Sequence, residues 1–380
     1  MGHPQKKSLP LLIGIWVITF PLSAESIAPF TMPSARLGAL GGNHAALADD
    51  FYTIFTNPAG FVDIEEEWNL AEISIGAYGP VFEILNLISQ PRDSLESLDI
   101  SGIVGPKGFA AGFDMGGPIA WGWVGRGMGI GIFNRTKADA ALAGTRLRPK
   151  ISEDILLLGG YSFRLLDQTS HTLDIGFLGK GFFRGALNLD SSVFSVMEMF
   201  EDPLNQPLTT YLGLGFDLGF RYTFAKSLSV GLVCYDLYSP ALVTVYNSFD
   251  DFANRVKPDK PGSYAEVTRR LALGVAYRIR TPFLDRYITN LTVMADYRDF
   301  IELFAPIPRN PILNIGIGAE LGLLNILTLR IGIADALPCA GFGLDLKFFK
   351  LDCAIRGKEL GIDPGLQSTY ALDLALLFRY

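Results

Sequence analysis

The sequence predicts an all-β fold, a transmembrane antiparallel β-barrel of about 14 strands. The first observation is that 49% of the 380 residues are hydrophobic and the mean hydropathy is +0.28, yet only one long apolar run occurs, at the N-terminus. A helical span needs about 20 consecutive apolar residues. A closed barrel also satisfies every backbone group in lipid, and its strands carry polar residues at alternate positions. The 41 glycines and 12% aromatic residues fit small lumen residues and aromatic girdles.

An export signal precedes the predicted barrel. Lys6 and Lys7 form a positive region, Leu9 to Phe20 form an apolar core, and Ala24 suits cleavage. The core is short for an uncleaved anchor helix, so residues 1–24 are predicted to be a cleaved signal peptide. No cysteine lies near the cut, which argues against a lipoprotein. Loss of the two lysines takes the formal charge from −7 to −9, and this acidity argues against a nucleic-acid partner.

The second observation is period-two alternation, which is most regular in the C-terminal residues Thr369 to Tyr380. One face is apolar or aromatic and consists of Tyr370, Leu372, Leu374, Leu376, Phe378 and Tyr380. The other face includes Asp373 and Arg379. Such alternation predicts a strand with one face in lipid and one in the lumen. A final aromatic residue after this pattern resembles the recognition signal of the barrel assembly machinery, which is therefore an expected partner.

The same pattern recurs along the chain. Clear runs are Thr210 to Phe224, Arg270 to Arg280, Ile155 to Phe163, Leu173 to Phe183, Leu291 to Tyr297, Ile315 to Leu321, Leu327 to Ile333, Phe342 to Phe348 and Leu351 to Ile355. Weaker runs are Leu70 to Tyr78, Phe109 to Met115, Met128 to Phe133, Ala138 to Leu147 and Ser229 to Leu237. Each is close to a spanning strand of about 9–11 residues. Because bacterial barrels have an even strand number, about 14 is predicted, with about 12 or 16 as alternatives.

The predicted lumen face carries both signs of charge. Its members are Asp174, Lys180, Asp217, Arg221, Arg278, Asp296, Glu320, Arg330, Asp345, Lys347, Asp352, Arg356, Asp373 and Arg379. A wide ion pore usually shows a bias of one sign, whereas mixed charges can pair across a narrow or filled barrel, so a plugged lumen is favoured. The glycines of Gly125 to Gly131 and Gly213 to Gly219 alternate along strands, which indicates lumen packing or a kink rather than a phosphate-binding loop.

Three segments break the strand rhythm. Gly79 to Gln90 and Ser191 to Phe200 are predicted to be short helices in loops. The polar stretch Ser248 to Tyr264 is predicted to be a long cell-surface loop. Cys339 and Cys353 could form a disulfide, although a small lipid-facing or interface residue is the more ordinary interpretation of Cys353.

No catalytic constellation stands out in the sequence. The three histidines are His3, His44 and His171, and the first leaves with the signal peptide. No histidine pair at ligand spacing and no four-cysteine set occurs, so no metal site and no cofactor are expected. A nucleophile-elbow motif is also absent. The chain is therefore not expected to be an enzyme.

The irregular segment between the signal peptide and the first strand carries a family resemblance. Pro33 to Val62 resembles the N-terminal segment of FadL-type long-chain fatty-acid transporters and of the related PorV outer-membrane proteins. The matching residues are Ala35, Arg36, Gly38, Gly41, Gly42, Ala45 to Asp50, and Asn57 to Gly60. Arg330 to Gly361 also looks like the last hairpins of this group, and the middle of the chain matches as a generic barrel.

The resemblance implies an architecture. It implies a barrel in the cell outer membrane (residues 67–380) with an N-terminal segment (residues 25–66) folded as a hatch inside the lumen. It makes Asn57, Pro58, Ala59 and Gly60 gate residues, although NPAG could simply turn the segment into the first strand. Gly41, Gly42, Asp49 and Asp50 are the other residues that it places in the hatch.

Two functions are expected from this resemblance. The first is passive uptake of a hydrophobic molecule, most simply a long-chain fatty acid, gated by the hatch. The alternative is a PorV-like barrel that serves as a scaffold or shuttle for other envelope or surface proteins. Outer-membrane lipid is an expected contact under either function.

Overall fold

The computed structural model describes residues 25–42, 44–80, 109–143, 146–189, 191–192, 202, 205–280 and 286–379. The predicted signal peptide lies outside these residues. In the described part of the chain, eighteen strands form one sheet. No helix among the described residues is both long and apolar enough to cross a membrane.

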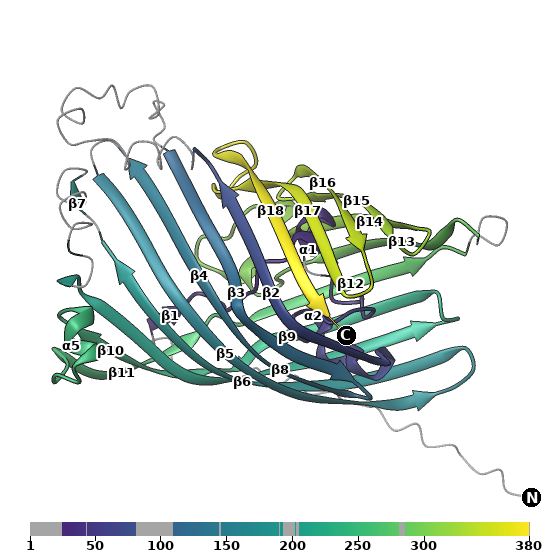
Figure 1. Cartoon of the computed structure of the whole chain (residues 1–380), viewed down its shortest axis with the longest axis horizontal. Coiled ribbons are helices and arrows are strands. Elements are labelled where there is room, and N and C mark those ends of the chain that lie inside the picture. Colours follow the sequence, from purple (N-terminus) through teal and green to yellow (C-terminus); the bar gives the residue numbers. More distant parts are fainter. Residues whose placement is uncertain are drawn as a thin grey trace, which may run out of the picture.

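Fourteen of the strands close a ring of antiparallel neighbours (Figure 1). In ring order they are β2 (Glu66–Tyr78), β3 (Phe109–Gly125), β4 (Met128–Ala143), β5 (Arg146–Asp167), β6 (His171–Asn188), β8 (Leu208–Phe224), β9 (Leu228–Tyr238), β12 (Arg270–Arg278), β13 (Ile288–Tyr297), β14 (Ile315–Leu323), β15 (Leu327–Ala334), β16 (Leu337–Asp345), β17 (Phe349–Glu359) and β18 (Ser368–Arg379). Strand β18 pairs with β2 and closes the ring. The predicted antiparallel barrel of about 14 strands is confirmed.

The remaining elements extend or fill this ring. They are the strands β1 (Glu25–Ile27), β7 (Ser191–Ser192), β10 (Pro240–Tyr246) and β11 (Lys260–Val267), the α-helices α1 (Ala35–Ala39), α2 (Thr53–Thr56) and α5 (Phe249–Ala253), and the 3-10 helices η1 (Pro58–Asp63), η5 (Glu302–Phe304) and η6 (Pro311–Asn314). Strand β10 continues β9 along β8, and β11 pairs with β10. Strand β1 pairs in parallel with β11.

The wall of the barrel is uneven in height. Strands β3, β4, β5, β6 and β8 have 16 to 22 residues, whereas β13 to β17 have 8 to 11. The expected length of about 9–11 residues is therefore wrong for the tall wall. The run Ala138 to Leu147 is not a strand of its own, because it begins in β4 and ends in β5.

The outer surface of the ring is apolar. Side chains on the outward positions are exposed and mostly Leu, Ile, Val, Phe or Tyr, as in Leu157, Leu214, Phe216 and Ile331. Charged residues of the same strands point inward and are buried, as Asp174 and Glu320 show. A closed barrel with an apolar exterior and a polar interior is an outer-membrane protein.

The connections at one end of the barrel are mostly short, and the long connections lie at the other end, together with the short ones after β4 and β15. Turns after β3, β5, β8, β14 and β16 are tight, while the connections after β2, β6, β10 and β13 are long. Barrels place short turns in the periplasm and long loops outside, which orients the chain.

The predicted loop elements differ in outcome. Only Gly79 and Pro80 of the first predicted loop helix lie among the described residues. In the second, Ser191 and Ser192 form strand β7 rather than helix, and most of the rest lies outside the described residues. The predicted polar loop Ser248 to Tyr264 is shorter in the structure and ends at Asp259. Its last residues belong to β11, which begins at Lys260 and pairs with β10. All three cysteines are free, so the Cys339–Cys353 disulfide is not formed.

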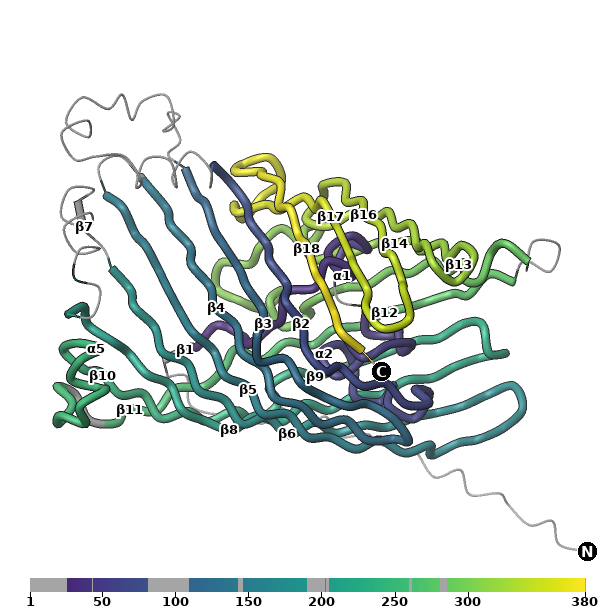
Figure 2. Tube along the Cα trace, in the orientation of Figure 1, coloured from purple at the N-terminus to yellow at the C-terminus, as the bar shows by residue number. Residues whose placement is uncertain are grey.

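The N-terminal segment lies inside the barrel (Figure 2). Helix α1 contacts β15, β16, β17 and β18, and η1 contacts β5, β6 and β8 on the opposite wall. Helix η1 lies at the periplasmic end, because the Gly127 N–H in the turn between β3 and β4 donates to the Phe61 carbonyl at 3.2 Å.

Candidate functional site

Inward-facing glycines of the ring strands make room for the N-terminal segment. A Cβ added at any of them would approach this segment within 3 Å: Gly122, Gly129, Gly160, Gly176, Gly219, Gly231, Gly318, Gly332 and Gly341. At Gly219 the Cβ would lie 2.0 Å from Asn57 Oδ1, and at Gly176 it would lie 2.3 Å from Ala59 N and the Pro58 carbonyl carbon. The glycine-rich strand faces therefore form the seat of this segment.

Asn57 fixes the turn of the N-terminal segment at the periplasmic side. It is fully buried, and its backbone is extended because the following residue is Pro58. Its side-chain amide donates to the carbonyls of Ala45 at 2.7 Å and Phe220 at 3.2 Å. Its Oδ1 accepts from the Ala59 N–H at 3.0 Å and caps η1. The residue thus joins two parts of the segment and strand β8.

Arg36 joins the segment to the opposite wall through buried ion pairs. Its guanidinium donates to Asp49 at 2.8 Å, to Asp50 at 2.5 Å and to Glu320 of β14 at 2.9 Å. The ring of opposite charges then continues from Glu320 through Arg330 (2.8 Å), Asp352 (2.6 Å) and Lys350 (3.5 Å) back to Asp50 (3.8 Å). We call these seven residues the charge ring. Buried charges persist when they are paired in this way.

A second buried contact involves His44. Its Nδ1 meets Asp296 of β13, and its Nε2 lies 2.8 Å from the Leu40 carbonyl. The other Asp296 oxygen accepts from the Ala45 N–H at 2.8 Å. Both ring nitrogens of His44 therefore have an oxygen partner. The contact fixes the chain between α1 and α2 against the wall.

Carboxylates of the segment are held in their charged form. Burial disfavours the charge on Asp50, but Arg36 and Lys350 lower its pKa below the usual range. Burial also disfavours the charge on Asp63, but its ion pairs with Arg221 and Arg164 lower its pKa below the usual range. A lowered pKa in the folded state means that these carboxylates stabilise the fold above about pH 4 and lose this contribution as the pH falls.

The lumen also contains an apolar strip. It is formed by inward residues of β4, β5 and β6, namely Phe133, Leu156, Leu158, Leu178 and Phe182. Residues of the N-terminal segment cover it: Phe30, Phe51, Ile54 and Phe61, with Met32 and Phe55 at the edge. The interior is therefore two-sided, with an apolar strip on the tall wall and the charge ring on the short wall.

Three cavities follow the barrel from outside to inside. The outer cavity has about 330 Å³, the central cavity about 30 Å³ and the inner, periplasmic cavity about 850 Å³. The central cavity is lined by the apolar residues Phe30, Ile54, Leu156 and Leu178 and by the charged residues Lys180, Asp217 and Arg270. A space of about 30 Å³ is the volume of one water in the liquid, so the lumen is closed there to an acyl chain.

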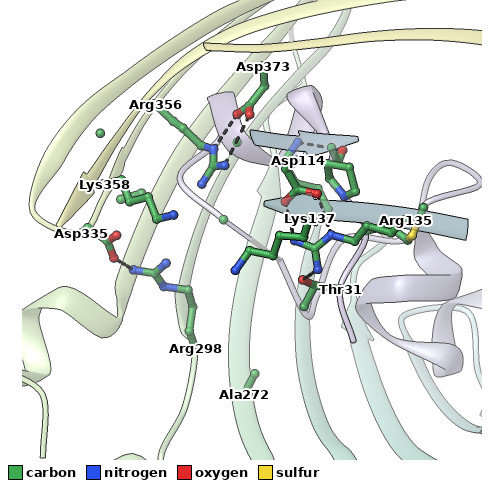
Figure 3. Close-up of a pocket in the computed structure, with 18 of the residues that line it drawn as sticks. Thr31, Asp114, Arg135, Lys137, Ala272, Arg298, Asp335, Arg356, Lys358 and Asp373 are labelled. Carbon is green, nitrogen blue, oxygen red and sulfur yellow. Dashed lines mark hydrogen bonds and ion pairs between the residues drawn. The ribbon is translucent and has the colours of Figure 1, made fainter. Parts of the chain in front are cut away.

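The outer cavity is rich in cations (Figure 3). Its lining has six basic residues, Arg135, Lys137, Arg270, Arg298, Arg356 and Lys358, and three acids, Asp114, Asp335 and Asp373. Among the described residues the three acids pair with Arg135, Arg298 and Arg356, and Lys137 pairs with Asp139 at 2.5 Å. Lys358 and Arg270 lie instead over the rings of Tyr78 (3.5 Å) and Tyr235 (4.9 Å). The cavity thus holds excess positive charge.

The residues predicted from sequence fall at distinct places. Gly41 packs against the carbonyls of Ile317 and Ile333, and Gly42 lies next to Arg298. Asp49 and Asp50 belong to the charge ring, and Asn57 to Gly60 lie in the glycine seat. Their role as a gate stays a prediction.

The predicted assembly-signal residues lie on the last strand. Tyr370, Leu372, Leu374, Leu376 and Phe378 occupy alternate positions of β18, four of them as exposed large hydrophobics on the outer face of the barrel. Tyr380 lies outside the described residues. Recognition by the assembly machinery stays a prediction.

Sequence reasoning missed the partners of Arg36 and His44, and it missed Lys358 and Arg270. The inward-facing glycines carried a usable signal, since they mark where a segment approaches the wall. Within the described residues, no group of three or more His, Cys, Asp or Glu side chains could hold a metal ion.

Comparisons with known proteins concern the fold. No protein-family model and no curated protein matches the sequence. The Ralstonia pickettii toluene transporter TbuX is 13% identical over 94% of this chain and 98% of that chain, with a TM-score of 0.49. A deletion mutant of the monoaromatic hydrocarbon channel TodX is 11% identical over 92% and 98%, with a TM-score of 0.48. A Pseudomonas aeruginosa FadL homologue is 11% identical over 94% and 99%, with a TM-score of 0.45.

Proposed function

We propose that this chain is a passive outer-membrane channel for hydrophobic molecules with an anionic head, most simply long-chain fatty acids. The N-terminal segment is its gate, and the chain is not an enzyme. The observation that carries the proposal is the two-sided interior: a cationic outer cavity adjoins an apolar strip. The outer and central cavities share Thr31, Met32, Leu37, Tyr235 and Arg270, so a carboxylate head in the first directs its chain toward the second.

Passage requires the N-terminal segment to move. The strip is covered by Phe30, Phe51, Ile54 and Phe61 of that segment, and the central cavity is too small for an acyl chain. Once displaced, the segment uncovers apolar wall from Phe182 toward Phe133, and a hydrophobic chain replaces its side chains there. A hydrophobic chain in that place would keep the apolar strip shielded from water.

A PorV-like scaffold or shuttle for envelope proteins is the second candidate. The observation that favours it is the same closure: the central cavity of about 30 Å³ leaves the barrel sealed. The two functions differ in their dependence on ligand chemistry. Binding to a channel should depend on the head group and the hydrocarbon chain of the ligand. A scaffold with a closed lumen should show no such dependence.

Changing Lys358 to Gln tests the cargo. Loss of one charge-assisted hydrogen bond, worth about 1.5–3 kcal/mol, should weaken binding of a labelled long-chain fatty acid by about tenfold or more. Binding of its uncharged methyl ester should stay at the wild-type level. The measurement is ligand binding by the purified barrel in detergent or vesicles. Lys257→Gln, an exposed lysine of the loop between β10 and β11, is the matched control. Equal loss for acid and ester, or no binding of either by wild type, would contradict the proposal.

A further inference from the structure

The extracellular loop between β13 and β14, residues 298–314, exposes apolar side chains. Phe304 is 87% exposed, Ile307 76% and Ile312 50%, and Ile301 and Leu303 are also exposed. The adjoining loop between β17 and β18 adds Ile362 and Leu366, each about half exposed. Asn310 joins the two loops, since its N–H donates to the Ile362 carbonyl at 2.8 Å. We call these seven apolar residues the loop patch. A patch of this kind marks an interaction surface.

Polar side chains of the same loop face the protein. Glu302 accepts from the Asn314 amide at 2.6 Å, and Arg309 pairs with Asp335 at 3.3 Å. Asp299 accepts from the Ile301 N–H at 2.9 Å and the Leu271 N–H at 3.3 Å. The outward face of the loop is therefore apolar because its charges are used internally.

The backbone of this loop offers few free donors. The N–H groups of Phe300, Phe304 and Ala305 donate to backbone carbonyls, and that of Ile312 donates to Asn310 Oδ1 at 3.2 Å. Three further positions, Pro306, Pro308 and Pro311, carry no N–H. Unpaired N–H and C=O groups both exclude irregular backbone from the hydrocarbon region, so the backbone of this loop belongs at the level of the lipid headgroups, from which only its apolar side chains reach the acyl chains.

The loop between β10 and β11 provides a contrast at the same end of the barrel. Its exposed residues include the charged Asp250, Arg255, Lys257 and Asp259 beside the apolar Phe249 and Val256, a mixture expected of a segment in water. It follows β10, which pairs with the 17-residue strand β8 of the tall wall. The apolar loop stands on the short wall, whose strands β13, β14 and β15 have 8 to 10.

The loop patch continues the lipid-facing belt. Outward residues of β14 and β15 just below it, Ile315, Ile317 and Ile333, are exposed and apolar. A tilted spanning strand needs about 9–11 residues, which β14 and β15 barely supply. The loop patch therefore supplies the missing apolar height on the short side of the barrel.

We infer that the loop patch inserts into the outer leaflet and contacts the acyl chains of membrane lipid. The short wall is thus completed by a loop instead of by longer strands, and the barrel sits with its two sides at different heights. This inference stands independently of what the channel carries.

Spin-label accessibility tests the inference. Cys234, Cys339 and Cys353 are replaced by Ala, and a nitroxide is attached at Phe304→Cys in the full barrel in lipid vesicles. Lys257→Cys is the water-exposed control and Ile331→Cys, 65% exposed on β15, is the lipid control. Heat-dependent gel migration verifies that each variant is folded.

The expected result is a ratio of oxygen to nickel-chelate collision rates at position 304 that is several-fold above position 257 and near that of position 331. A ratio at 304 equal to that at 257 would overturn the inference. The loop patch would then face water, which is the arrangement of a docking surface for another envelope protein.

Discussion

Replacing Arg36 by methionine is expected to release the N-terminal segment from the short wall while the barrel stays assembled. The ion pairs of Glu320 with Arg330 and of Asp50 with Lys350 remain in this variant. Asp49 loses the one ion-pair partner that it has among the described residues. An uncompensated charge that is fully buried costs about 3–5 kcal/mol, and the cost is lower here because the side chain of Asp49 is 20% exposed. The segment should then open, and single-barrel conductance in planar bilayers should rise above the wild-type value.

Arg126→Met is the matched control for this change. Arg126 also pairs with an acid, Glu66, but its side chain is 77% exposed, and exposed pairs contribute about 0–1 kcal/mol. Its conductance should equal that of the wild type. If the Arg36 variant conducts no more than the Arg126 variant, with equal amounts of folded barrel, the charge ring does not hold the segment.

Gly176→Val is expected to push the Asn57–Gly60 turn out of its seat. The added Cβ would meet backbone atoms of Pro58 and Ala59 at 2.3 Å, which are not able to rotate away as a side chain would. Overpacking costs about 1–3 kcal/mol or more, while valine itself suits a strand. Conductance and protease cleavage of the N-terminal segment should both increase.

The control lies on the same strand. Gly181 faces the other side of β6, where a Cβ finds its nearest neighbour at 3.8 Å, so Gly181→Val should behave like the wild type. Equal conductance and equal protease resistance in both variants would show that the turn does not depend on this seat.

Much of the barrel could be predicted from the sequence, because the alternation imposed by lipid is local. Each of the fourteen ring strands contains or overlaps one run of alternating residues found in the sequence. The pattern failed where the tall wall rises beyond the lipid. The runs found in the sequence leave out Asn134 to Lys137, but these residues lie within β4, where Arg135 pairs with Asp114 and Thr136 with Glu153.

Contacts between the N-terminal segment and the barrel could not be predicted in the same way. Arg36 and Glu320 are separated by 284 residues, and His44 and Asp296 by 252. Nothing in local composition selects one lumen acid over another for such a pair. The lining of the outer cavity could not be predicted for the same reason. Lys358 of β17 and Arg270 of β12 are far apart in the sequence and line one cavity only in the closed ring.

Uptake of a labelled long-chain fatty acid by vesicles that contain the purified barrel tests the central claim most directly. Wild type should exceed empty vesicles, and the Asn57→Ala, Pro58→Ala double variant should change uptake per folded barrel. The double change removes the three hydrogen bonds of the Asn57 side chain, each worth about 0.5–1.5 kcal/mol net, without altering a ring strand. Uptake by wild type no greater than in empty vesicles, or identical uptake per folded barrel in the two proteins, would contradict a gated channel and favour the scaffold.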